Sequence, residues 1–115
     1  MPNQICHFQL VAPDPAKTRE FLARVFNWSF RDDPAHHYTV IHTGADPNGG
    51  IVRTQPDGRP TCLIYVAVDD LEETLAKVAA AGGQVLQPAS GIEGIGTWAI
   101  VADPDGVPIG VFTPD

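Results

Sequence analysis

The sequence predicts an α+β domain made of two copies of one β-α-β-β-β unit, and two repeated stretches carry this prediction. The alternating apolar run at 5–15 leads into an aspartate that can begin a helix, and the run at 61–71 has the same plan. Farther along each half, Ala-Asp-Pro-Asn-Gly at 45–49 is echoed by Ala-Asp-Pro-Asp-Gly at 102–106. Because both echoes come in the same order, we interpret the chain as a fused repeat.

The register of the repeat follows from residues that recur at one interval. The spacing between Cys6 and Cys62 equals the spacing between Asp14 and Asp70. At 115 residues the chain is long enough for one substantial core but not for two. We therefore expect one domain, 1–115, with the first unit at about 3–54 and the second at about 61–114.

Capping residues predict one helix in each unit. Asp14 before Pro15 is a favourable helix start, and Asn27 is a favourable left-handed stop, which predicts a helix over 15–26. Asp70 and Glu73 have the spacing of a capping box, and glycines at 82–83 end the run, which predicts a helix over 71–81. Apolar residues recur at helical intervals in both segments: Phe21, Leu22, Val25 and Phe26, then Leu71, Leu75 and Val78.

Strand-like segments follow each predicted helix, separated by turn residues. In the first unit they lie at 28–31, 37–43 and 50–54, and in the second at 84–87, 97–101 and 109–113. The glycine-rich segment 91–96 lacks the features of a phosphate-binding loop, and we interpret it as a mobile lid.

Composition and charge limit the partners. Seven Lys and Arg against 14 Asp and Glu give a net charge of −7, which argues against duplex nucleic acid and anionic membrane surfaces. A small neutral or cationic molecule, or another protein chain, is a better partner for a chain of this charge. No apolar stretch approaches the roughly 20 residues needed to span a bilayer, and residues 1–4 lack a signal-peptide pattern, so we expect a cytoplasmic protein.

The two cysteines are predicted to be structural. Cys6 and Cys62 are far apart and form no C-x-x-C pair, which argues against a disulfide framework or a zinc site. Each shares a strand face with apolar residues, and we expect these faces to lie beneath the helices. We therefore predict that both thiols are buried, reduced and functionally silent.

Motifs along nearly the whole chain resemble one known superfamily. They are the strand-to-helix start at 7–15, Asn-Gly-Gly-Ile at 48–51, Val-Asp-Asp-Leu at 68–71, Gly-Ile-Gly-Thr-Trp at 94–98, and Asp-Pro-Asp-Gly at 103–106 followed by Ile109 and Gly110. In this order they resemble the glyoxalase/bleomycin resistance/dioxygenase, or vicinal oxygen chelate, superfamily, and more narrowly small bacterial proteins related to lactoylglutathione lyase. The resemblance implies two modules whose sheets form a curved mixed sheet around a cavity, helices on the outer face, and often a homodimer.

The resemblance also implies where a metal would lie. Metal-dependent members take one ligand from the first strand and one carboxylate from the last strand of each module. The matching positions here are His7, Gly50, Leu63 and Gly110, of which only His7 can bind a metal. Because three or four protein ligands are the norm, we expect no metal and no other cofactor.

Strand alternation predicts a ligand-binding face. His7 and Gln9 alternate with apolar residues in the first strand, and Tyr65 occupies the position of Gln9 in the second copy. We predict that these three line one pocket with Trp98 and Phe112. His7 is also a candidate general acid or base, although a lone histidine is more often a ligand contact. Gln9 and Tyr65 could instead hydrogen-bond to each other.

Two function classes follow from these residues, and a third stays open. The first is a metal-independent protein that binds a small organic molecule in the cavity between its modules, either to sequester it or to convert it. The alternative is a metal-dependent lyase, isomerase or dioxygenase with atypical ligands, such as His42 or residues of a second subunit. A ligand-regulated interaction module is also possible, because a fold does not fix a function.

Overall fold

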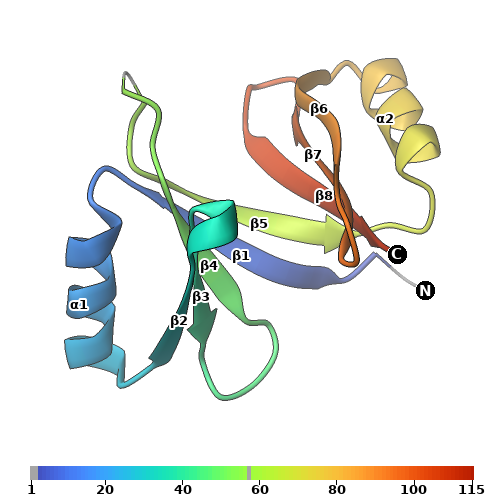
Figure 1. The fold of residues 1–115 in the computed structure, drawn as a ribbon. Coiled ribbons are helices and arrows are strands. Elements are labelled where there is room, and N and C mark those ends of the chain that lie inside the picture. The colour runs from blue at the N-terminus through green and yellow to red at the C-terminus, as the bar shows by residue number, and fades with distance from the viewer. Residues whose placement is uncertain (1–2, 57) are drawn as a thin grey trace. The chain divides into compact units, whose positions relative to one another are not determined.

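The computed structural model describes residues 3–56 and 58–115, and for His36 the backbone alone. The chain divides into two compact units (Figure 1). The first module is Cys6–Leu63, and the second is Ile64–Asp115 together with the N-terminal segment up to Ile5. Each module is described by itself.

The first module has the predicted β-α-β-β-β order, with a short 3-10 helix added. Its elements are β1 (Ile5–Ala12), α1 (Pro15–Phe26), β2 (Ser29–Asp33), the 3-10 helix η1 (Pro34–His36), β3 (Tyr38–His42) and β4 (Gly49–Arg53). The strands lie in the order β2-β3-β4-β1. Strand β1 runs parallel to β4, and the other neighbours are antiparallel, so the sheet is mixed.

The second module repeats this plan when the whole of β5, including its first three residues, is counted with it. Its elements are β5 (Thr61–Ala67), α2 (Leu71–Ala80), β6 (Gln84–Ile92), β7 (Gly96–Ala102) and β8 (Pro108–Pro114). The strands lie in the order β5-β8-β7-β6, with β5 parallel to β8 and the other neighbours antiparallel. The predicted α+β class is therefore confirmed.

Both helices begin and end where capping chemistry predicts. The Asp14 carboxylate accepts a hydrogen bond from the Lys17 backbone N–H, and Asn27 ends α1 in the left-handed region at φ 57°. In α2 the Asp70 carboxylate accepts from the Glu73 N–H at 3.0 Å. The helix ends at Ala80, one residue before the predicted boundary.

Each helix packs on one face of its own sheet, and this decides which residues remain for a site. In the first module Leu22 of α1 packs against Ala12, Ile41 and Ile51. In the second, α2 packs against β6, β7 and β8 (Figure 1). The core there consists of Val68, Leu71, Ala99, Val101 and Val111, with Val66, Leu75, Val78 and Ile109 at its margin.

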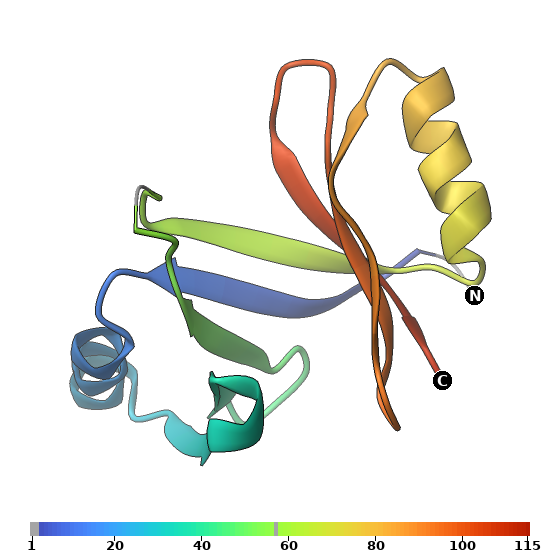
Figure 2. The same cartoon turned by 45° about the horizontal axis from the view of Figure 1, so that its top comes forward.

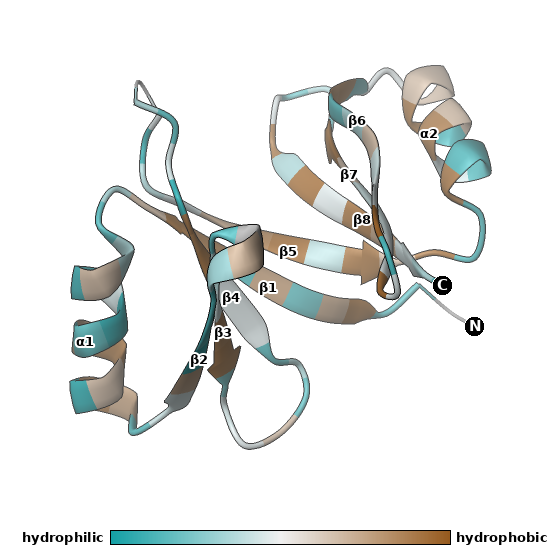
Figure 3. Ribbon diagram, in the orientation of Figure 1, coloured by the Kyte–Doolittle hydropathy of each residue, from teal (hydrophilic) through white to brown (hydrophobic). Residues whose placement is uncertain are grey.

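Alternation along the first strand of each module places polar residues opposite the helix. Phe8 and Leu10 pack towards α1, and Val66 packs towards α2, so the intervening residues lie on what we call the helix-free face. Figure 3 shows this alternation as brown bands between teal or pale bands along β1 and β5. The predicted parity of these strands therefore agrees with the packing inside each module.

The prediction of buried cysteines is wrong. Cys6 and Cys62 are both exposed, and Ile64 beside Cys62 has 41% of its surface exposed. The apolar contacts with α1 begin at Phe8 and those with α2 begin at Val66, so the strand starts lie outside the cover of the helices. Alternation correctly gives the side of the sheet but not how far along the strand the helix reaches.

The expected lid at 91–96 is also wrong. Strand β6 continues to Ile92, where it pairs with Gly96, and Gly91 pairs with Thr97. The Ile95 backbone N–H donates to the Ile92 carbonyl at 2.9 Å, which closes a tight turn. These residues therefore form the end of the β6–β7 hairpin, the orange tip at the bottom of Figure 2.

The repeated Asp-Pro segments lie in equivalent places, the β3–β4 and β7–β8 loops. In the second of these the Asp103 carboxylate accepts from the N–H groups of Asp105 and Val107 at 2.9 and 2.8 Å. Hydrogen bonding within the turn thus accounts for this acidic sequence. In the part of the chain that the structure describes, no helix is long and apolar enough to cross a membrane.

Candidate functional site

The helix-free face of the first module contains a histidine–tyrosine pair. His7 lies on β1 and Tyr38 lies at the start of β3, two strands away in the sheet. The His7 Nε2 atom and the Tyr38 hydroxyl are 2.5 Å apart and form a hydrogen bond, and the two rings lie nearly parallel with their centroids 6.2 Å apart. The tyrosine side chain therefore crosses the strand that lies between them.

That strand is β4, and it contributes a glycine at the crossing point. Gly50 pairs with Gln9 on one side and with Val40 on the other. A Cβ atom built on Gly50 would overlap the hydroxyl and ring of Tyr38. Glycine is therefore the residue that lets the Tyr38 phenol lie directly on the backbone of β4 and reach His7.

Partial burial controls the charge of the imidazole. Removal from water disfavours the protonated ring, so the pKa of His7 is lowered from its ordinary value. The ring is accordingly neutral near pH 7. A neutral imidazole either accepts from the Tyr38 hydroxyl or donates to its oxygen, depending on which ring nitrogen carries the hydrogen.

We expect the lowered pKa of His7 to make the free energy of unfolding depend on pH. Below the ordinary histidine pKa of about 6.5 the unfolded chain takes up a proton at this position before the folded chain does. Stability should therefore fall as the pH falls through this value, until the folded state is also protonated at its lower pKa. Urea unfolding of the wild type and of His7→Gln across this range measures the effect. A constant difference between the two proteins would contradict it.

The second module places aromatic rings on its helix-free face. Tyr65 pairs with Gly110, and Trp98 pairs with Phe112. A Cβ atom built on Gly110 would overlap the Tyr65 ring, which is only 6% exposed. The Phe112 ring lies in the same way against Gly96.

The structure therefore distributes the five predicted site residues between two faces. His7 and Gln9 lie on the helix-free face of the first module, and Tyr65, Trp98 and Phe112 lie together on that of the second. Their roles in binding a ligand stay a prediction.

Strand pairing identifies a residue that sequence reasoning missed. Val40 pairs with Gly50, and Ile100 pairs with Gly110, so β3 and β7 have the same register in their modules. Two residues before these positions stand Tyr38 and Trp98, which are thus equivalent. Because Trp98 is among the predicted site residues, its equivalence to Tyr38 is the signal that points to Tyr38, and this signal comes from strand pairing.

The four positions where the resemblance implies metal ligands do not suit a metal ion. Gln9 pairs with Gly50 and Tyr65 pairs with Gly110, so the two glycines are equivalent. His7 and Leu63 are also equivalent, because each lies two residues before the paired residue of its strand. The space in which a side chain from either glycine would begin is filled by a tyrosine. These four positions thus supply one imidazole and no carboxylate, which is too few ligands to bind a divalent metal ion.

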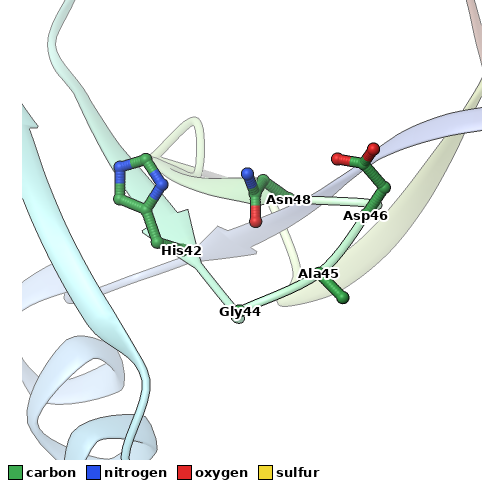
Figure 4. Close-up of a pocket in the computed structure, with 5 residues that line it drawn as sticks. All are labelled: His42, Gly44, Ala45, Asp46 and Asn48. Carbon is green, nitrogen blue, oxygen red and sulfur yellow. The ribbon is translucent and has the colours of Figure 1, made fainter.

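Elsewhere, no three His, Cys, Asp or Glu side chains come together in 3–56 and 58–115, leaving aside the His36 side chain. His42, considered above as an atypical ligand, lies at the end of β3 beside an open cavity of about 290 Å³. Gly44, Ala45, Asp46 and Asn48 line the rest of it. Figure 4 shows the side chains of His42 and Asn48 on one side of this loop and that of Ala45 on the other. The Asn48 side-chain oxygen accepts a hydrogen bond from the Thr43 N–H, so this side chain stabilises the loop.

Comparison with known sequences gives a match over almost the whole chain. Residues 4–111 match the profile of the glyoxalase/bleomycin resistance protein/dioxygenase superfamily. "Putative glyoxylase CFP32" of Mycobacterium tuberculosis is 30% identical, over 96% of this chain and 44% of the relative. "Anthracycline biosynthesis protein DnrV" of Streptomyces peucetius is 27% identical, over 96% of this chain and 47% of the relative. The chain thus spans less than half the length of these relatives.

Solved structures show the same fold. The Mn(II)-bound glyoxalase from Novosphingobium aromaticivorans has a TM-score of 0.71 at 21% identity, covering 96% of this chain and 38% of that one. Methylmalonyl-CoA epimerase from Mycobacterium tuberculosis has a TM-score of 0.69 at 13% identity, covering 96% and 87%. At these identities the similarity concerns the fold alone.

Proposed function

Starting from the chain's membership of the glyoxalase/bleomycin resistance protein/dioxygenase superfamily, we propose that it binds a small organic molecule without a metal ion. The molecule contacts a helix-free face, which offers hydrogen-bonding groups in the first module and aromatic rings in the second. Such a mixture of apolar surface with few polar groups is typical of small-molecule sites.

One observation carries the proposal: in both modules a tyrosine ring takes the place of the side chain from which a carboxylate would reach a metal. Tyr38 lies on Gly50 and Tyr65 lies on Gly110. The two tyrosines come from different strands, β3 and β5, so the ring that lies on the glycine has a different origin in each module. What these positions offer to a ligand is a phenol hydroxyl, an imidazole and ring faces, rather than charged oxygen donors.

His7 gives this site a group that can take up or release a proton. Its pKa is lowered by burial, so at neutral pH the imidazole is a base rather than an acid. Acid–base conversion of a bound molecule by His7 is therefore compatible with the proposal, while simple sequestration needs only the binding surface.

We expect ligand binding to survive removal of divalent metals. The test is an NMR titration of chelator-treated protein with small aromatic ketones and phenols, in which the backbone signals of Tyr38, Gly50, Trp98 and Gly110 should shift. Adding Mn²⁺ should not selectively broaden the signals of His7 and its neighbours, because the surrounding donors are too few. Binding that appears only after Mn²⁺ or Zn²⁺ is added would instead support the metal-dependent lyase, isomerase or dioxygenase.

A further inference from the structure

We propose that the first module has a second ligand site, on the helix side of its sheet, which binds a small organic carboxylate through Arg53. The site lies across the sheet from the His7–Tyr38 pair, so it goes beyond the proposed function and does not depend on it.

The first support is a cavity where α1 and β3 begin and β4 ends. Its volume is about 390 Å³, which is in the range of small-molecule sites. Thr39 pairs with Ile51, and Arg53 follows Ile51 by two residues, so all three side chains belong to the side of the sheet that α1 covers. The cavity is lined by Pro15, His37, Tyr38, Thr39, Ile51 and Arg53. The ring of Tyr38 itself extends away over Gly50.

The cavity exists because the first turn of α1 brings no large side chain to the sheet. The buried residue of α1 is Leu22, nearly two turns after Pro15, and it packs in the cluster with Ile41 and Ile51. On the other border His37 has φ 52°, a left-handed turn that leads the chain from η1 into β3. The course of the backbone therefore leaves room for a ligand between the start of α1 and the sheet.

The second support is the arrangement of the arginine. Arg53 Nη1 donates a hydrogen bond to the Pro13 carbonyl at 2.8 Å, which ties the end of β4 to the residues just before α1. A guanidinium has five N–H groups in a planar fork, and this contact uses one of them. The fork matches the two oxygens of a carboxylate, and its position is already fixed before a ligand arrives. Arg53 is exposed, so a ligand reaches it directly from solvent.

Charge and apolar contact define the ligand class. The two carboxylates nearest in sequence to the lining already accept hydrogen bonds: Asp32 accepts from Arg19 at 2.8 Å, and Asp14 accepts from the Lys17 backbone N–H at 3.3 Å. The remaining negative charge of the chain is screened over about 10 Å, whereas an ion pair with Arg53 forms at contact distance. Ile51 and Pro15 offer apolar contact to the rest of the molecule. These features together favour a monocarboxylate with a small apolar body.

The experiment compares benzoate with benzyl alcohol, two probes of similar shape that differ in charge. Each is titrated into the wild type while the NMR methyl signals are followed. We expect benzoate to bind about tenfold more tightly, the effect of one charge-assisted pair. The Ile51 methyl signals should shift, and those of Val40 and Val52, whose side chains belong to the helix-free face, should not.

Variants of two arginines separate the site from overall charge. Arg53→Gln removes the charge but keeps an amide that can donate to the Pro13 carbonyl, so the preference for benzoate should fall to about one. Arg53→Lys keeps the charge without the planar fork and should retain part of the preference. Arg31→Gln is the matched control, because Arg31 pairs with Val40 and so lies on the helix-free face of the same module. This variant should keep the full preference.

The outcomes decide the inference independently of the proposed function. It is overturned by equal affinity for the two probes in the wild type, by a preference that persists in Arg53→Gln, or by an equal loss in Arg31→Gln. It is also overturned if benzoate shifts the methyl signals of Val40 and Val52 instead of those of Ile51, or fails to bind at millimolar concentration. The proposed function fails on a different observation, binding that requires added Mn²⁺ or Zn²⁺.

Discussion

Gly110→Ala should lower the free energy of unfolding by about 2–3 kcal/mol, the usual effect of inserting an atom into a filled space. Gly110 is buried, and the added methyl group would overlap the Tyr65 ring. That ring is only 6% exposed, so it cannot turn away without displacing other buried groups. Urea or guanidinium unfolding of the two proteins measures the difference.

The control is another glycine in a strand of the same module. A Cβ atom on Gly91 would have no heavy atom within 4 Å, so Gly91→Ala should change stability by less than about 0.5 kcal/mol. The double variant Gly110→Ala/Tyr65→Leu should lose less free energy of unfolding than the sum of the two single variants, because leucine leaves room for the added methyl group. Equal effects of Gly110→Ala and Gly91→Ala would show that the ring does not lie where the structure places it.

Ile51→Ala should lower the free energy of unfolding by about 3 kcal/mol, within the range for deleting buried aliphatic side chains. Ile51 is 1% exposed and packs in the cluster with Ala12, Leu22 and Ile41. It follows Gly50 directly on β4 and points to the opposite side, towards α1. The loss should therefore be one of packing, with the His7–Tyr38 hydrogen bond still detectable by NMR in the folded variant.

A surface residue of α1 provides the comparison for this change. Val25 is 54% exposed, so Val25→Ala should alter stability by less than about 0.5 kcal/mol. If Ile51→Ala were as mild as Val25→Ala, the packing of α1 on β3 and β4 described above would be wrong.

Features that depend on neighbours in sequence were predictable. Helix starts at Asp14 and Asp70 depend on a side chain bonding to a backbone N–H three residues later, and both helices form where predicted. The side of the sheet on which Phe8 or Tyr65 lies follows from alternation alone. These are local rules, and the chain obeys them in both modules.

Features that depend on distant partners were not predictable in the same way. The exposure of Cys6 depends on how far α1 extends over β1, and this length cannot be derived from the alternation of residues along the strand. The glycines at 91–96 are compatible with a lid or a hairpin, and pairing of Gly91 with Thr97 decides for the hairpin. Tyr38 is not predicted by local patterns because its contacts lie across β4, with a glycine and a histidine on two other strands.

The tyrosine that lies on each glycine also constrains the order in which substitutions can accumulate. In this chain Gly50→Glu would place its Cβ on the Tyr38 hydroxyl, and Gly110→Glu would place its Cβ on the Tyr65 ring, so a carboxylate at either position requires that the ring moves or is replaced. Removing the ring first leaves a void beside the strand, and adding the carboxylate first displaces the tyrosine side chain, so either single change is expected to lower the free energy of unfolding. Each tyrosine–glycine pair is thus expected to change as a unit, because neither partner can be altered alone without a loss of stability.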